Sequence, residues 1–203
     1  MVKIQSIDSI AGNYYKKHKS KNPAVQYILK KFYSDLDKLI GDTYFHSILD
    51  VGCGEGVTTK YLKKKYIVSD VHFLDISKKI ISDNFDISES MLSLCADSHF
   101  LPYKDDSFDF VISTEVLEHL ESPKESLLEL RRVSKKACVV SVPNEPFWRI
   151  ANICRMSYLL HLGNTPGHIN HFTILSLPKL LKSMFSDVKI SYSTLWIIAY
   201  CIK

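Results

Sequence analysis

Between residues 47 and 143 the chain alternates short apolar runs with stretches of helical periodicity. The apolar runs are candidate strands: SILDV, VHFLDI, MLSLCAD, FDFVIS and ACVVSV. Helices are expected between them, over residues 57–66, 77–85, 115–120 and 123–133. Continuous apolar strands that alternate with helices predict a parallel sheet with helices on both faces, because each such strand must be buried from both sides.

The two ends of the chain depart from this alternation. The first 45 residues are basic and helical, and Asn22 and Pro23 begin a helix that Gly41 ends. At the other end, VKISYS and LWIIAYCIK are separated by only a short turn, which predicts an antiparallel hairpin. We therefore expect an N-terminal helical cap over residues 1–45 and one α/β domain over residues 46–203.

Composition limits the class of protein. The 203 residues suit one domain, and the longest apolar run, Leu195–Ile202, is far shorter than the ~20 residues of a membrane span. The N-terminus lacks the hydrophobic core of a secretory signal, and the five cysteines form no CxxC pair. We therefore expect a cytoplasmic protein. The net charge of +4 comes mostly from lysine, so no specific nucleic-acid partner is expected.

The strongest local signal is the glycine-rich segment Ile48–Gly56, which follows an apolar strand and opens a helix. Its glycines allow a tight turn and a close approach of the backbone to a ligand. The spacing departs from the dinucleotide fingerprint, because the third glycine falls one residue early, and the lysine of a phosphate-binding P-loop is absent. With Asp50 and Glu55 beside it, the loop favours a ligand that carries positive charge.

Three further motifs follow the glycine loop: FLD ending at Asp75, CADS at Asp97 and Ser98, and FDFVIS followed by Thr114 and Glu115. In this order the four motifs resemble the class I S-adenosylmethionine-dependent methyltransferases, and among them the type 11 group that includes quinone-biosynthesis methyltransferases. The resemblance covers residues 22–203. It implies a three-layer, doubly wound, Rossmann-like α/β fold. Its seven-stranded, mostly parallel sheet would have the strand order 3-2-1-4-5-7-6, with the last strand antiparallel.

The resemblance also implies the cofactor S-adenosyl-L-methionine, its product S-adenosyl-L-homocysteine, and their contacts with the chain. The methionine part would be surrounded by Asp50, Gly52, Gly54 and Gly56. The nucleoside would be held by Asp75 on the ribose hydroxyls, Ile76 on the adenine ring, and Asp97 and Ser98 at the adenine amino group. The methyl end would be lined by Ser113, Thr114 and Glu115. One aspartate after a strand is equally well explained as a helix cap, but the set together favours a ligand at the carboxyl ends of the strands.

A second cluster, Glu115, Glu118 and His119, would share one face of a helix. With His168 and His171 of the later GHINHF segment, these side chains offer ligands for a divalent metal. The pattern resembles the metal site of small-RNA 2′-O-methyltransferases and of metal-dependent quinone O-methyltransferases. We favour a site without metal, in which His119 is the general base and Glu118, His168 and His171 lie on the acceptor side. A structural, hydrogen-bonded role for the histidines is the alternative.

Residues 143–176 follow the fifth strand, where the acceptor site lies in such folds, and we expect them to form an acceptor-side lid. Within them, residues 147–162 are apolar and contain Arg149 and Arg155. This composition predicts a lid packed on the domain. The alternative is an apolar acceptor tunnel or a helix that contacts a membrane. Tyr14 and Tyr15 are further candidates for lid residues.

Together these features predict methyl transfer from S-adenosyl-L-methionine to an oxygen of a small-molecule or lipid-like acceptor. The protein would act as a monomer or homodimer, with peripheral membrane contact as one further interaction. Two alternatives stay open. One is metal-assisted 2′-O-methylation of RNA, which the lack of an RNA-binding appendage disfavours. The other is a non-catalytic, cofactor-binding partner subunit, which the complete glycine loop disfavours.

Overall fold

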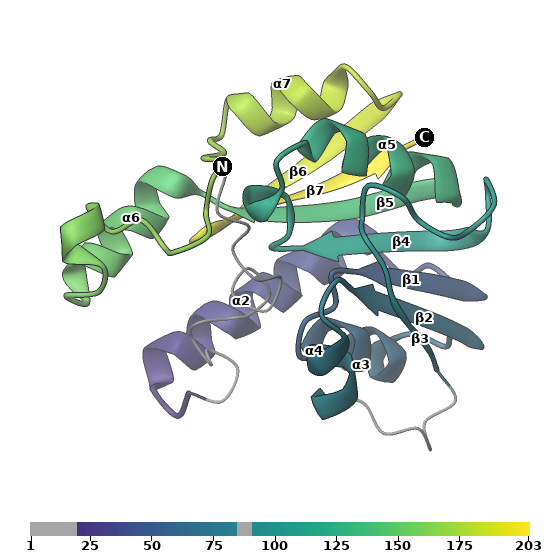
Figure 1. The fold of residues 1–203 in the computed structure, drawn as a ribbon, viewed down its shortest axis with the longest axis horizontal. Helices are drawn as coiled ribbons and strands as arrows, with labels where there is room; N and C mark the ends of the chain where they lie inside the picture. The colour runs from purple at the N-terminus through teal and green to yellow at the C-terminus, as the bar shows by residue number, and fades with distance from the viewer. Residues whose placement is uncertain (1–19, 85–90) are drawn as a thin grey trace, which may run out of the picture.

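The computed structural model describes residues 20–84 and 91–203, and these residues form a seven-stranded sheet with helices around it (Figure 1). The strands are β1 (Ser47–Val51), β2 (Asp70–Asp75), β3 (Leu92–Cys95), β4 (Phe108–Thr114), β5 (Ser134–Pro143), β6 (Asp187–Ser193) and β7 (Trp196–Ile202). Their order is β3-β2-β1-β4-β5-β7-β6. Strands β1 to β5 pair in parallel, whereas β7 is antiparallel to both β5 and β6. The expected fold class, strand order and C-terminal hairpin are confirmed.

Helices cover both faces of this sheet. The α-helices are α2 (Pro23–Ile40), α3 (Val57–Lys65), α4 (Lys78–Asn84), α5 (Pro123–Val133), α6 (Glu145–Cys154) and α7 (Ser176–Lys182). Two short 3-10 helices are η2 (Leu117–His119) and η3 (Leu159–His161). Helices α2 and α3 bury Leu36 and Leu62 in one core, and α5 and α7 bury Leu130 and Leu177 in the other.

The two cores explain why the central strands are continuously apolar. Phe110 and Val111 are neighbours on β4, both fully buried, and they belong to opposite cores. Successive side chains of a strand point to opposite faces of the sheet, so a strand covered on both sides is apolar at every position.

Helix α2 begins and ends where the sequence predicts. The Asn22 side chain caps its first turn, and Gly41 follows its last residue with a φ of 71°. The buried side chains of α2 pack against β6 and β7. Residues 23–40 of the expected N-terminal cap therefore form one layer of the domain.

Three smaller expectations concern single segments. The helix expected over residues 77–85 is α4, which the structure describes from Lys78 to Asn84. The expected lid residues Tyr14 and Tyr15 lie outside the described residues. Among the residues that are described, no helix is both long and apolar enough to cross a membrane.

We predict that Leu36→Ala lowers the free energy of unfolding by about 2–5 kcal/mol, because Leu36 is fully buried and its truncation leaves a cavity between α2 and the sheet. Urea unfolding followed by circular dichroism measures the change. Tyr27→Ala, on the same helix at 67% exposure, is the control and should change stability by less than about 0.5 kcal/mol. Equal effects of the two substitutions would contradict the packing described here.

Candidate functional site

A cavity of about 510 Å³ opens at the carboxyl ends of the first four strands. Its wall combines segments that are far apart in the sequence: the glycine loop after β1, residues 74–76 after β2, residues 96–100 after β3 and residues 114–125 after β4. Helix α2 closes one side of the cavity with Leu29, Phe32 and Tyr33. The strand order reverses beside β1, so the cavity lies where a doubly wound sheet binds its ligand.

The wall of this cavity is acidic. Six carboxylate side chains line it: Glu55, Asp75, Asp97, Glu115, Glu121 and Glu125. No lysine or arginine of the described residues lines it, although the chain as a whole carries a net charge of +4. A wall of this kind disfavours phosphate groups and favours a ligand with positive charge. The ligand charge inferred from the glycine loop therefore agrees with the whole cavity.

The glycine loop is tied to the end of β2. The backbone N–H groups of Gly52 and Cys53 both donate to the carbonyl oxygen of Leu74, at 2.8 and 2.9 Å. Gly52 has a φ of 75°, and a Cβ placed there would lie 2.3 Å from Cγ2 of Val116. Gly54 has a φ of 53°, and a Cβ placed there would meet no atom within 4 Å. The loop thus packs tightly at Gly52 and leaves open space beside Gly54.

Asp75 completes the loop on the cavity side. Its Oδ2 accepts the backbone N–H of Gly54 at 3.0 Å, and its Oδ1 accepts the backbone N–H of Ser77 at 2.9 Å. Each carboxylate oxygen carries two acceptor sites, so both oxygens can still accept a hydrogen bond from a ligand hydroxyl. The carboxylate that the resemblance assigns to the ribose therefore lines the cavity and can still accept hydrogen bonds from a ligand.

The residues expected at the adenine all line the cavity. Ile76 lines the cavity and is 43% exposed, and Ser98 lines it while 8% exposed. Asp97 also lines it, and its Oδ1 accepts both the backbone N–H and the Nδ1–H of His99, at 2.9 and 2.6 Å. These bonds hold the Asp97 carboxylate in place at the cavity wall.

Three expected cofactor contacts, Asp50, Gly56 and Ser113, are not part of the cavity wall. Ser113 is fully buried and donates to the carbonyl oxygen of Val51 at 2.9 Å. Gly56 has a φ of 70° and precedes the first residue of α3. These three residues lie in the expected segment without lining the cavity, so their assignment as cofactor contacts stays a prediction.

Asp50 lies fully buried beneath the glycine loop. Its Oδ2 accepts the hydroxyl of Thr59 on α3 at 2.5 Å, and its Oδ1 has no hydrogen-bond partner among the described residues. Burial, reinforced by the nearby charge of Asp75, raises the pKa of the Asp50 carboxyl to about 7. The side chain therefore links the loop to α3 instead of reaching the cavity.

The segment that follows β4 is not the helix that the sequence predicted. Glu115 has a φ of 58°, and only Leu117–His119 form a short 3-10 helix. The expected shared face of Glu115, Glu118 and His119 is therefore wrong, because a left-handed residue interrupts it. Glu115 and His119 line the cavity, whereas Glu118 is 1% exposed and lies behind it.

One group of side chains could hold a metal ion. Glu118, His119 and His168 each offer one ligand atom, and the three atoms lie within 4.8 Å of one another. Glu115 and His171, which the sequence grouped with them, are not members. The rings of His119 and His168 meet edge to face at 4.9 Å, so these two residues are brought together across 49 positions of the chain.

The loop that carries His168 is fixed against His119. Nδ1 of His119 donates to the carbonyl oxygen of Gly167 at 2.9 Å, and Nδ1 of His168 donates to Oε1 of Glu145 at 2.8 Å. The backbone N–H groups of Ile169 and Asn170 both donate to the carbonyl oxygen of Glu118. Because a carbonyl oxygen can only accept, the neutral His119 ring carries its lone pair on Nε2.

His171 takes a different position from His168. Its Nδ1 lies 3.7 Å from Oε2 of Glu145, and its Nε2 lies 3.1 Å from a guanidinium nitrogen of Arg149. Neither His168 nor His171 lines the cavity. Of the candidate acceptor-side residues, His119 is therefore the one that reaches it.

Three residues of the wall, Tyr33, Thr58 and Trp196, belong to no motif found in the sequence, whereas Thr114 was expected at the methyl end. Tyr33 of α2, Thr58 of α3 and Thr114 of β4 approach one another through their hydroxyl groups, with both separations at 3.5 Å. Burial raises the pKa of Tyr33 to about 12, so this phenol stays protonated at neutral pH. Trp196 of β7 lines the same side. These residues meet through packing between distant elements, which no local sequence pattern predicts.

Comparisons with known proteins agree with this architecture. Residues 49–142 match a family model described as a methyltransferase domain. The malonyl-[acyl-carrier protein] O-methyltransferase of Halorhodospira halophila is 34% identical over 90 residues, which cover 43% of this chain and 30% of that protein. The human mitochondrial arginine-hydroxylase NDUFAF5 is 30% identical over 91 residues, covering 45% of this chain and 26% of that protein.

Among solved structures, the plantazolicin methyltransferase BpumL, determined in complex with a monoazolic desmethylPZN analogue and SAH, shares the fold. Its TM-score is 0.70 at 16% sequence identity, with 90% of this chain and 85% of that chain covered. Strand order and cavity position define a class I methyltransferase fold. Within that class, residues 49–142 are an S-adenosylmethionine-dependent methyltransferase domain of the type 11 group. The chain spans less than half the length of the curated relatives it matches.

We predict that Asp50→Asn changes the pH dependence of stability. The unfolded carboxyl ionises near its ordinary pKa of 3.8 and the folded one near 7, so the wild-type protein loses stability as the pH rises between these values. The variant should therefore gain stability relative to wild type from pH 4 to pH 7 and keep a constant advantage above it. The gain is at most about 4 kcal/mol, since each pH unit between the two pKa values contributes about 1.4 kcal/mol.

Urea unfolding of both proteins at a series of pH values measures this difference. Other titrating groups are common to the two proteins and cancel in the comparison. A difference in stability that stays the same from pH 4 to pH 8 would contradict a raised pKa for Asp50.

Proposed function

We propose that the protein transfers a methyl group from S-adenosyl-L-methionine to an oxygen of a small-molecule or lipid-like acceptor. The observation that carries the proposal is the acidic cavity, whose wall includes Asp75, Glu115, His119 and the open side of Gly54. Membership of residues 49–142 in the methyltransferase family supports the same reaction.

The residues of the cavity fit this cofactor. Its sulfonium carries a positive charge, which the carboxylates of the wall stabilise. The Asp75 carboxylate offers acceptors for the two ribose hydroxyls, and the exposed side of Ile76 offers an apolar surface for a flat ring. The space beside Gly54, where a side chain would begin, lets the ligand approach the backbone.

When bound, the cofactor supplies an electrophilic methyl group on a positively charged sulfur. The chain then has two tasks. The first is to hold the acceptor oxygen in line with the methyl group, and such positioning can provide much of the rate enhancement. The second is to remove the hydroxyl proton as the oxygen forms its new bond to carbon. His119 is the base for this step, with Nε2 as the atom that accepts the proton.

Glu118 and His168 act behind His119 in this proposal. The carbonyl oxygen of Glu118 anchors the loop 167–170, and the bond from His168 to Glu145 holds that loop against the start of α6. Gly167 thereby stays in place to fix the tautomer of His119. No step of the proposed reaction needs a metal ion.

We predict that Asp75→Ala weakens binding of S-adenosyl-L-homocysteine by about 100-fold, the loss expected when hydrogen bonds to a charged acceptor disappear. Isothermal titration calorimetry measures the affinity. Asp187→Ala removes an exposed carboxylate at the start of β6, far from the cavity, and should leave the affinity unchanged. Unchanged binding by the Asp75 variant would contradict the assignment of Asp75 to the ribose hydroxyls.

We predict that methyl-labelled S-adenosyl-L-methionine, incubated with the protein and a fractionated cell extract, delivers label to the lipid or small-molecule fraction. Because a relative named for hydroxylation shares this domain, the assay follows the methyl group itself. Label in RNA would instead favour metal-assisted RNA methylation. Cofactor binding without label in any fraction would favour a non-catalytic partner subunit.

In the labelled fraction, we predict that His119→Gln lowers the transfer rate by about 100-fold or more while S-adenosyl-L-homocysteine still binds. A variant that transfers methyl groups at the wild-type rate would show that the acceptor needs no base at this position.

A further inference from the structure

The outward face of α6 is apolar. Glu145 and Asn152 of this helix point inward and are 3% and 1% exposed. Phe147, Ile150 and Ile153 point outward and are 54%, 56% and 43% exposed. A helix on the surface of a protein in water normally has the reverse arrangement, with its apolar stripe inward. Helix α6 therefore buries polar side chains and exposes apolar ones, the reverse of the usual amphipathic orientation.

Specific contacts fix this inverted orientation. Oε1 of Glu145 accepts Nδ1–H of His168 at 2.8 Å, and Nδ2 of Asn152 donates to the carbonyl oxygen of Gly163 at 2.8 Å. The same Asn152 amide and the indole of Trp148 both donate to the hydroxyl of Thr165. Turning the apolar face inward would break these buried hydrogen bonds, which is costly. The apolar face is therefore a stable part of the surface.

The apolar surface continues beyond the helix to the turn at its tip. Met156 is 79% exposed, Leu159 48%, Leu160 97% and Leu162 74%. We call residues 147–162 the apolar arm. Figure 1 shows the arm projecting from the body of the domain, on the side where the strands of the sheet end. A projecting group of large apolar side chains marks an interaction surface.

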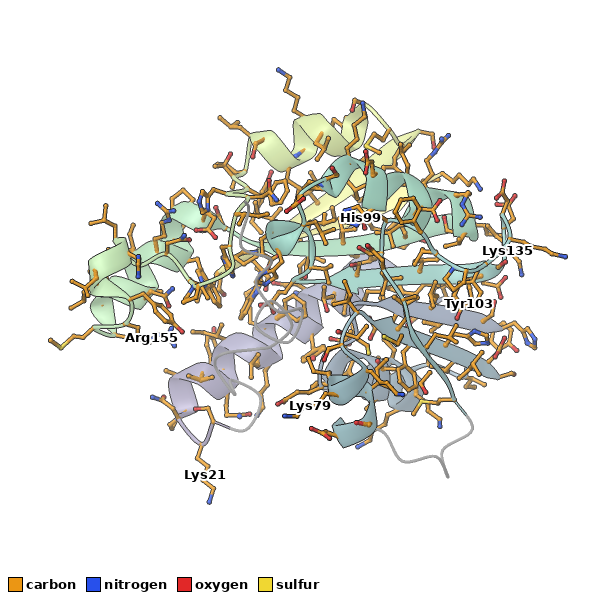
Figure 2. The ribbon with its side chains drawn as sticks, in the orientation of Figure 1. Lys21, Lys79, His99, Tyr103, Lys135 and Arg155 are labelled. Atoms are coloured by element: carbon orange, nitrogen blue, oxygen red, sulfur yellow. The ribbon has the colours of Figure 1, made fainter. Side chains whose placement is uncertain are left out.

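The charge of this region identifies the kind of partner. Residues 146–186 contain no aspartate and no glutamate, although the whole chain has 22 acidic residues. The same stretch contains four cations: Arg149, Arg155, Lys179 and Lys182. Arg155 lies on the apolar arm (Figure 2). A surface that combines apolar side chains with positive charge, and omits negative charge, matches a partner that is apolar inside and anionic outside.

We infer that the apolar arm docks on the surface of an anionic lipid bilayer. Phe147, Met156 and the leucines at the tip would enter the boundary between headgroups and acyl chains, and Arg155 would meet lipid phosphates. Arg149 is paired with the buried Glu145, at 3.4 Å. A second copy of the chain fits less well, because a two-fold contact between two arms would bring together two surfaces that carry cations and no aspartate or glutamate. The inference stands apart from methyl transfer, since docking needs no cofactor.

Vesicle co-sedimentation of the full chain tests this inference. Vesicles of phosphatidylcholine with about 30% phosphatidylglycerol should bind the protein, vesicles of phosphatidylcholine alone should bind it more weakly, and added salt should reduce the binding. Leu160→Glu should lower partition into the anionic vesicles by about tenfold or more, since it replaces a leucine that would enter the bilayer with a charge that anionic lipids repel. Leu160 is 97% exposed, so the substitution leaves the fold intact.

The matched control is Ile67→Glu. Ile67 is 81% exposed and precedes the amino end of β2, whereas the arm follows the carboxyl end of the parallel strand β5. This variant should bind vesicles like the wild-type protein, and both variants should keep their affinity for S-adenosyl-L-homocysteine. Loss of that affinity would concern the proposed reaction and not the docking.

Three results would overturn the inference. The first is no binding of the wild-type protein to anionic vesicles at low salt. The second is an equal loss of binding in the Leu160 and Ile67 variants. The third is a concentration-dependent dimer, seen by analytical ultracentrifugation, that Leu160→Glu abolishes, because the arm would then be covered by a second copy.

Discussion

The cavity depends on the tie between the glycine loop and the end of β2. Two consecutive backbone N–H groups, from Gly52 and Cys53, share the carbonyl oxygen of Leu74, and a third, from Gly54, donates to the Asp75 carboxylate. These bonds close the loop over the end of the neighbouring strand. They also place the carboxylate and the open backbone of Gly54 on the same side, toward the cavity. The side chain of Val116 leaves no room for a Cβ at residue 52, so only glycine fits this turn.

Charge is distributed so that the cavity differs from the rest of the molecule. A net positive chain surrounds a wall with six carboxylates and, among the described residues, no lysine or arginine. The cations lie elsewhere. Some of them fall in the stretch from residue 146 to residue 186, which contains no acidic residue. A cationic cofactor and an anionic surface would therefore be attracted to different parts of the same small domain. This separation connects the proposed reaction with the docking inferred for the apolar arm.

The sequence predicted the features that depend on local patterns. Burial on both faces makes the middle of strands such as β4 apolar, so their existence could be inferred, whereas the strand order came from the resemblance to the methyltransferases. Other features depend on contacts between distant segments. Glutamate has no particular preference for a left-handed backbone, so the conformation of Glu115 could not be predicted. His168 reaches His119 only because loop 167–170 is hydrogen-bonded to η2. The apolar composition of residues 147–162 did not show which face of α6 points inward, because the helical period is the same in both cases.

A crystal structure of the protein with S-adenosyl-L-homocysteine tests the central claim most directly. The account predicts that the ligand lies in the acidic cavity, with its ribose hydroxyls on the Asp75 carboxylate and its sulfur toward Glu115 and His119. A ligand bound outside this cavity, or one whose ribose makes no contact with Asp75, would contradict the account.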